Sequence, residues 1–359
     1  MPRITGNKGE WSELYVLLEL LATGKLYAAD ENIRRIDTIY FPLLKILRDE
    51  GDNRNIVYEF GHESSIELYI NGVQIKRLSM AELKQHAETL FNEIKRGTDR
   101  AFSIEAADGI MEQIECKKIK APSSDKTDIK MQVLDINTGY SPVCGFSIKS
   151  ELGSAPTLLN AGRTTNFQYE ISGITDADML RINAIDDPRS KIMDRMNAIC
   201  EIGTLRFTKA QNTTFSSNLM LIDSLMDDIV SKALEIYYKH NISSCKAVIE
   251  KLEEDNPLGF PGTGFYEYKF KKFLCSVALG MTPSRVWDGR DEANGGYIIV
   301  TTDGDVLAYH IYNRDYFEQY LLNNTKFERA STTRHDFASI YKEGDRFFIN
   351  LNLQIRFTR

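Results

Sequence analysis

The chain has 359 residues, of which 44 are Lys or Arg and 51 are Asp or Glu, so its formal net charge is −7. Hydrophobic residues make up 42% of the sequence, which is enough to bury a substantial core and excludes wholesale disorder. No apolar run reaches the roughly 18 residues that a membrane span requires, and the N-terminus carries no signal-peptide core. The negative net charge excludes a surface that is basic throughout, but it says little about the local charge of one cleft.

The cysteines and histidines do not form a metal-binding or disulfide pattern. The five cysteines lie far apart, contain no CxxC pair and are odd in number, which is typical of reduced thiols in the cytoplasm. The five histidines are equally scattered, so we do not expect a zinc site.

Secondary structure is clearest in the N-terminal part. Leu14, Leu17, Leu18 and Leu21 recur at helical spacing, and Gly24 is a suitable C-terminal cap, so a helix is predicted to end there. Alternating residues 55–78 predict strands, and the sequence from 80 to 96 predicts an amphipathic helix. Helical or extended structure is expected at 102–120, followed by a polar loop at 121–127.

The rest of the chain mixes helices and strands. Two strands, 128–136 and 143–149, flank a turn, and a loop is expected from 153 to 166. Alternation predicts antiparallel strands within 295–312 and 346–357. Helices are predicted at 176–182, 189–200, 218–240 and 244–254, whereas 265–278 is ambiguous between helix and strand.

The order of these elements is that of an α+β (mixed α/β) protein without regular βαβ alternation. We expect three parts, with uncertain boundaries that leave room for one compact unit. They are an N-terminal helix and strand region (1–120), a hairpin and helical region (121–255), and a C-terminal β-rich region (256–359).

The strands around residue 139 carry the most informative polar residues. A turn centred near residue 139 places Asp128 opposite about residue 150, beside Lys149, and Ser147, Lys149 and Glu151 share one strand face. A carboxylate and a lysine so arranged suit metal-assisted phosphodiester hydrolysis. The alternative is structural, because an Asp often begins a strand and a Lys often extends from a sheet edge.

Glu13 is a further candidate carboxylate. It precedes Leu17 by four residues and therefore borders the apolar stripe of the first predicted helix. The alternative is that Glu13, like Glu10, only favours the positive end of the helix dipole.

Three long segments, 7–30, 145–167 and 265–321, and the final NLNLQIRF resemble the HpaII-type family of type II restriction endonucleases. The resemblance extends over nearly the whole chain. It implies a PD-(D/E)xK-like nuclease core, with a central mixed β-sheet flanked by helices and additional DNA-recognition elements. It further implies Mg²⁺-dependent cleavage of double-stranded DNA at a short palindromic site of the CCGG type. A homodimer would match the palindrome, and a cognate cytosine methyltransferase would complete the restriction–modification system.

Residue by residue, the resemblance assigns the first acid of the motif to Asp128 and the lysine to Lys149. The sequence departs from the motif twice, because Thr127 replaces the proline and Ser147 replaces the second acid. The catalytic residues implied are therefore Asp128, Ser147 and Lys149. The implied metal ligands are Asp128 with Glu151 and Glu13, the two candidates for the missing acid.

Two polar loops are candidates for reading DNA sequence, because Arg and Asn side chains form bidentate hydrogen bonds to base edges. The first loop spans residues 154–166 and the second spans residues 282–296. The candidate residues are Asn160, Arg163, Thr164 and Asn166 in the first loop, and Arg285 and Arg290 in the second. In the second loop the alternative is local ion pairing with Asp288, Asp291 and Glu292.

Two other functions remain open on the sequence alone. Ser147 at the acid position suits a DNA-binding or interaction protein with a degenerate nuclease fold. A metabolic α/β enzyme is less favoured, because the chain has neither a GxGxxG nor a GxxxxGK[ST] loop.

Overall fold

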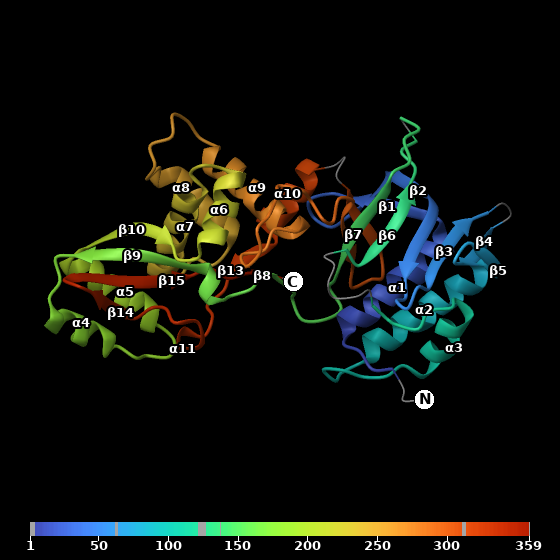
Figure 1. Cartoon of the computed structure of the whole chain (residues 1–359), viewed down its shortest axis with the longest axis horizontal. Coiled ribbons are helices and arrows are strands. Elements are labelled where there is room, and N and C mark those ends of the chain that lie inside the picture. The colour runs from blue at the N-terminus through green and yellow to red at the C-terminus, as the bar shows by residue number, and fades with distance from the viewer. Residues whose placement is uncertain (1–3, 62–63, 121–126, 137, 311–313, 359) are drawn as a thin grey trace. The chain divides into compact units, whose positions relative to one another are not determined.

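The computed structural model describes residues 4–61, 64–120, 127–136, 138–310 and 314–358. These residues form two compact units, and each unit combines two separate stretches of the chain (Figure 1). The first unit comprises Met1–Ser154 and Asp291–Tyr320, and the second comprises Ala155–Arg290 and Leu321–Arg359. This division differs from the three contiguous parts that we expected from the sequence.

Capping residues mark the starts of α1 (Lys8–Thr23) and α2 (Met80–Arg96) and the end of α1. Asn7 and Glu10 form a capping box at the start of α1, and Gly24 closes the helix in the left-handed conformation with φ of 64°. The Ser79 side chain caps α2. The helices that begin in this unit are α1 (Lys8–Thr23), α2 (Met80–Arg96), α3 (Glu105–Gln113) and α10 (Arg314–Asn323).

Nine strands among the described residues form the sheet of the first unit, in the order β1-β12-β11-β7-β6-β2-β3-β4-β5. β1 also pairs with β2, so six strands close into a barrel-like ring, from which β3, β4 and β5 extend. The pairs β7–β11 and β1–β12 are parallel and the others are antiparallel, so the sheet is mixed. The strands are β1 (Lys25–Ala29), β2 (Arg35–Asp49), β3 (Asn55–Phe60), β4 (Ser65–Ile70), β5 (Val73–Ser79), β6 (Ile129–Val133), β7 (Val143–Ser150), β11 (Gly296–Val300) and β12 (Val306–His310).

The core of the first unit lies between this sheet and the helices α1, α2 and α3, which Figure 1 shows on the same side of the strands. Trp11 of α1, Tyr58 of β3 and Phe146 of β7 are fully buried in it. Burial of aromatic side chains of this size supplies much of the hydrophobic stabilisation of a domain. The strand that carries Ser147 and Lys149 is therefore anchored in a packed core.

The second unit contains a four-stranded sheet, β10-β9-β15-β14, and a three-stranded sheet, β13-β16-β8, among its described residues. Phe167 and Tyr169 on one face of the larger sheet contact the helices, whereas Asn166 and Gln168 alternate onto the other face. Its strands are β8 (Thr157–Leu159), β9 (Asn166–Ser172), β10 (Thr204–Ala210), β13 (Thr325–Phe327), β14 (Ile340–Glu343), β15 (Arg346–Asn352) and β16 (Ile355–Phe357). Its helices are α4 (Asp176–Asn183), α5 (Lys191–Ile202), α6 (Thr213–Ile222), α7 (Met226–His240), α8 (Cys245–Asp255), α9 (Phe265–Leu279) and α11 (Thr332–His335).

The α+β class is confirmed, and so are most of the predicted helices and strands. Two predictions are wrong in detail. The segment 218–240 is not one helix, because Asp223 leaves the helical conformation and its carboxylate accepts the Leu225 N–H at 2.9 Å. The expected loop 153–166 contains β8 and a short 3₁₀ helix at Arg163–Thr165. The ambiguous segment 265–278 is helical. Residues 121–126 and 137 of the predicted loop and turn lie outside the described residues.

A membrane crossing would need a longer and more apolar helix than any that the described residues form.

Candidate active site

The antiparallel strands β6 and β7 bring Asp128 directly opposite Ser147. Ile129 pairs with Phe146, and the main-chain N–H of Asp128 donates to the Phe146 carbonyl at 2.9 Å. The predicted register, which placed Asp128 opposite about residue 150, is therefore wrong by three positions. The predicted turn centre lay too far toward the C-terminus, because the Asp135 N–H donates to the Tyr140 carbonyl at 2.9 Å.

Asp128, Ser147 and Lys149 form a continuous row of hydrogen bonds. The Ser147 hydroxyl donates to Asp128 Oδ2 at 3.0 Å and accepts from Lys149 Nζ at 2.9 Å. The main-chain N–H of Ile148 donates to the same Oδ2 at 2.6 Å. Ser147 is only 5% exposed, whereas Asp128 and Lys149 are half-buried. A carboxylate and an ammonium are thus fixed on either side of one hydroxyl, and both remain accessible.

Tyr297 is a neighbour of Lys149 that the sequence did not single out. β11 pairs in parallel with β7 so that Tyr297 lies beside Ser147, and Lys149 Nζ lies 5.2 Å from the centre of the Tyr297 ring. An ammonium near a ring face is attracted by the ring's quadrupole. Alternation predicted the strand that carries Tyr297, but no local signal indicated its pairing with a strand about 150 residues earlier.

Residues on either side of β7 also hold the hairpin in place. The Thr127 hydroxyl donates to the Glu292 carbonyl at 3.2 Å, and Asn294 Oδ1 accepts the Gly145 N–H at 2.8 Å. Both contacts join the segment before β11 to the hairpin. Thr127, which stands at the proline position of the motif, therefore has a structural partner.

Helix α1 approaches the end of β7 near Glu13. The hydroxyl oxygens of Ser12 and Ser150 are hydrogen bonded at 2.8 Å. Glu13 is half-buried, and its charge contributes to the raised pKa of Lys120, although the hydrogen bond from Lys120 to Glu10 has the larger effect. Ser12, the residue before Glu13, is therefore in contact with the end of the strand that carries Lys149.

The sequence analysis placed Glu151 on the same strand face as Ser147 and Lys149, but its carboxylate contacts a different segment. Its carboxylate accepts the main-chain N–H of Thr302, in the turn between β11 and β12. Burial raises the pKa of Glu151, and the nearby charge of Asp303 raises it further, although the Thr302 hydrogen bond opposes both effects. Glu151 is thus directed toward this turn, whereas Ser147 and Lys149 are joined to Asp128.

The described residues contain no group of three or more His, Cys, Asp or Glu side chains arranged to hold a metal ion. Asp128 nevertheless suits a cation that keeps most of its water ligands. Both hydrogen bonds that other described residues donate to its carboxylate end on Oδ2, which leaves Oδ1 for a cation. Mg²⁺ commonly binds through one or two carboxylates together with waters and a substrate phosphate. The carboxylates of the described residues therefore suit a Mg²⁺ ion that keeps several water ligands better than an ion coordinated by protein side chains alone.

The first candidate DNA-reading loop is divided between surface and interior. Asn160 and Arg163 are exposed, and Thr164 is half-buried. Asn166 is 1% exposed, and its side-chain amide donates to the His335 carbonyl at 2.9 Å. The Asn166 amide is thus already used within the second unit, whereas Asn160 and Arg163 are free to meet a partner molecule.

The second candidate loop carries Arg285 and Arg290 on the surface. Arg290 Nε lies 3.7 Å from Asp288 Oδ2, and these side chains are 89% and 68% exposed. Exposed pairs of this kind contribute little energy, so Asp288 does not prevent Arg290 from binding another anion. Asp291 pairs instead with Arg314, at 3.7 Å.

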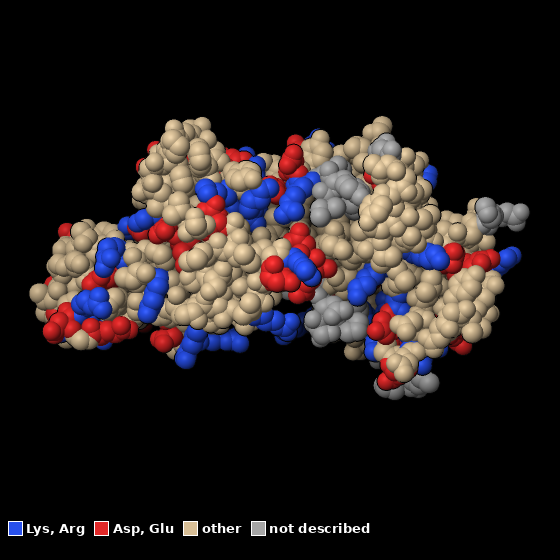
Figure 2. Space-filling model, turned by 45° about the horizontal axis from the view of Figure 1, so that its top comes forward, with Lys and Arg blue, Asp and Glu red and all other residues tan. Residues whose placement is uncertain are grey.

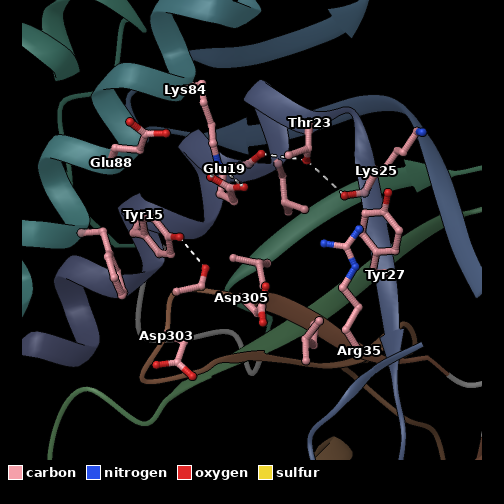
Figure 3. Close-up of a pocket in the computed structure, with 15 residues that line it drawn as sticks. Tyr15, Glu19, Thr23, Lys25, Tyr27, Arg35, Lys84, Glu88, Asp303 and Asp305 are labelled. Carbon is pink, nitrogen blue, oxygen red and sulfur yellow. Dashed lines mark hydrogen bonds and ion pairs between the residues drawn. The ribbon is translucent and has the colours of Figure 1, made fainter. Parts of the chain in front are cut away.

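A cavity of about 290 Å³ lies elsewhere in the first unit, between α1, α2 and the β11–β12 turn (Figure 3). One ion pair lies within its walls, where Lys84 Nζ binds both carboxylate oxygens of Glu19 at 2.8 and 2.9 Å. Arg35 stacks on Tyr27, 3.5 Å from the ring centre. Neither Asp128, Ser147 nor Lys149 is among the described residues that line the cavity. We therefore place the candidate active site at the hairpin.

Comparison with known proteins agrees with the resemblance seen in the sequence. A model of the HpaII restriction endonuclease family matches residues 7–357. The chain therefore belongs to the HpaII restriction endonuclease family. The type II restriction enzyme HpaII from Haemophilus parainfluenzae is 40% identical to it over 357 residues, which cover 98% of each chain. No solved structure matches the chain.

Proposed function

We propose that this chain cleaves double-stranded DNA at a short palindromic site, of the CCGG type, by Mg²⁺-assisted hydrolysis of a phosphodiester bond. Membership of the family supports site-specific cleavage. The observation that carries the proposal is the row of hydrogen bonds from Asp128 through Ser147 to Lys149. If Asp128 only began a strand and Lys149 only extended from a sheet edge, their side chains would not need to form hydrogen bonds to the same buried hydroxyl group.

The proposed core is PD-(D/E)xK-like, with a serine at the position of the second acid. The antiparallel β6–β7 hairpin, with Asp128 before one strand and Lys149 near the end of the next, supports it. Glu13 and Glu151 remain the proposed sources of a second carboxylate. Ser12 and Ser150 bring α1 to the end of β7 and so favour Glu13, whereas Glu151 would first have to leave Thr302.

Each residue of the row has a distinct proposed role in hydrolysis. Asp128 would hold the cation, while the Ser147 hydroxyl and the Ile148 N–H fix one oxygen of its carboxylate. Lys149 orients the attacking water and stabilises the charge that develops on the phosphate. Ser147 keeps Lys149 and Asp128 aligned. The chemistry that Mg²⁺ supplies when bound is neutralisation of the phosphate charge and a lower pKa of the attacking water.

DNA recognition is proposed for the exposed parts of both candidate loops, namely Asn160, Arg163, Thr164, Arg285 and Arg290. For Asn166 we propose that it shapes the first loop from inside. A homodimer is the proposed assembly, because two-fold symmetry matches a palindrome. The proposed biological partner is a cytosine methyltransferase that protects the same site.

A DNA-binding protein without cleavage activity is the second candidate function. Two observations favour it: Ser147 replaces a charged ligand, and the described residues contain no cluster of three metal ligands. Cleavage of plasmid DNA into discrete fragments distinguishes the two functions.

Variants of the row test the proposal. Asp128→Ala and Lys149→Ala should each lower the rate of plasmid cleavage in Mg²⁺ at least about 100-fold, because each removes a group that acts on the transition state. The controls are Asp135→Asn and Lys130→Ala, which change the same residue types in the same hairpin and should cleave near the wild-type rate. Circular dichroism should show that all four variants are folded. Near wild-type cleavage by either Asp128→Ala or Lys149→Ala would contradict the assignment.

A further inference from the structure

One buried asparagine fixes the main chain at three points in the first part of the second candidate loop. Asn218 lies on α6 and is 2% exposed. Its Nδ2 donates to the carbonyls of Thr282 and Arg285 at 3.1 and 2.8 Å, and its Oδ1 accepts the N–H of Trp287 at 3.0 Å. A single side chain therefore holds the two residues that flank Val286.

The far end of the loop is closed by its own residues. The Trp287 indole N–H donates to the Arg290 carbonyl at 2.8 Å, and the Arg290 N–H donates to Asp288 Oδ1 at 3.1 Å. Gly289 has a φ of 84°, which favours glycine at this turn. Hydrogen bonds thus determine the path of the loop from Thr282 to Arg290.

The tip of this ordered loop is displayed to solvent. Val286 is 86% exposed and Arg285 is exposed beside it. Exposing an apolar side chain on a fixed loop gives no stability to the isolated chain. It does give affinity for a partner, because little conformational entropy is lost when a pre-ordered loop binds.

We propose that Asn218 is a positioning residue for DNA recognition, which holds Arg285 for hydrogen bonding to a guanine edge and Val286 for contact with an adjacent base. The proposal rests on the proposed function. A guanidinium reads guanine through O6 and N7 together, and this requires a defined approach of the main chain that carries it. Asn218 holds this main chain in place through its hydrogen bonds from inside the second unit.

The test compares Asn218→Ala with a matched control, Asn183→Ala. Asn183, the last residue of α4, likewise fixes main chain, since it donates to the Ile340 carbonyl and accepts the Ile340 N–H, both at 2.8 Å. The measurement is the ratio of cleavage rates for the sequence that the wild type cuts and for sequences with one base pair changed. Asn218→Ala should lower this ratio about tenfold or more, which is the discrimination that one bidentate contact supplies. Asn183→Ala should leave the ratio unchanged.

The possible failures are distinguishable. A wild type that produces no discrete fragments would contradict the proposed function itself, and with it the inference. A wild type that discriminates, together with an Asn218→Ala variant that melts at lower temperature but keeps the ratio, would overturn only the inference. If Asn218→Ala does not fold, the exposed substitutions Arg285→Lys and Val286→Ala replace it. Both should lower the ratio, and an unchanged ratio in both would overturn the inference.

Discussion

At the scale of single residues, Ser147 holds the candidate active site together. It cannot supply the charge of the carboxylate that the motif usually has, but its hydroxyl contacts both Asp128 and Lys149. The hydroxyl is buried, so these hydrogen bonds compete little with water. We therefore propose that Ser147 positions Asp128 and Lys149, a role that does not depend on charge.

The corresponding prediction concerns Ser147→Ala. Loss of the hydroxyl leaves Lys149 without its partner in the row, so kcat should fall on the order of 10- to 100-fold, the cost of misplacing a reacting group. The control is Ser141→Ala in the same hairpin, whose hydroxyl oxygen lies 3.5 Å from Gln132 Nε2 instead and whose cleavage rate should stay near that of the wild type. Steady-state kinetics on a short duplex measures both. An unchanged kcat in Ser147→Ala would exclude the positioning role.

At the scale of elements, close packing between Gly145 and Thr127 fixes the position of Asp128 at the start of the hairpin. A Cβ added to Gly145 would lie 2.6 Å from Thr127 Cγ2 and 2.8 Å from Thr127 Oγ1. Thr127 has little freedom to move, because its hydroxyl is bonded to the Glu292 carbonyl. The position of Asp128 therefore depends on the absence of a side chain at Gly145.

Gly145→Ala should displace Thr127 and Asp128 together. We expect a loss of about 1–3 kcal/mol in the free energy of unfolding, as for other overpacked sites, and slower cleavage by the folded protein. Gly109→Ala is the control, because its Cβ would meet open space on helix α3. Denaturant unfolding and cleavage assays measure the two effects. A Gly145→Ala variant as stable and active as the wild type would show that Thr127 can adjust.

The elements that the sequence predicted best are those determined locally. α2 has the predicted bounds, and α1 ends at the predicted Gly24, because an apolar stripe and capping residues define both helices. β1 and β2 were not predicted. β1 pairs with β2, which follows it directly in the chain, but it also pairs with the distant β12, and the 15-residue β2 changes partner along its length.

The candidate site was partly predictable for the same reason. The motif positions Asp128, Ser147 and Lys149 could be assigned from sequence, and the structure joins these three side chains. The register could not be assigned, because a shift of the turn by one or two residues changes every cross-strand pair. The Thr302 partner of Glu151 and the Tyr297 partner of Lys149 come from β11 and the turn after it, which reach β7 only through long-range parallel pairing.

At the scale of the whole molecule, the net charge of −7 is consistent with local binding of DNA. Figure 2 shows basic and acidic side chains interspersed in small patches over the face in view. Such a surface gives weak attraction for DNA in general, since non-specific affinity depends on many phosphate contacts. Discrimination should therefore depend on a few base contacts, such as those proposed for Arg285.

The most direct test of the central claim is digestion of plasmid DNA by the purified wild-type chain in Mg²⁺, followed by sequencing of the fragment ends. We predict discrete fragments whose ends all fall within one short palindromic sequence of the CCGG type, and no cleavage when EDTA removes the metal. Ends scattered over unrelated sequences, or intact plasmid in Mg²⁺, would contradict it.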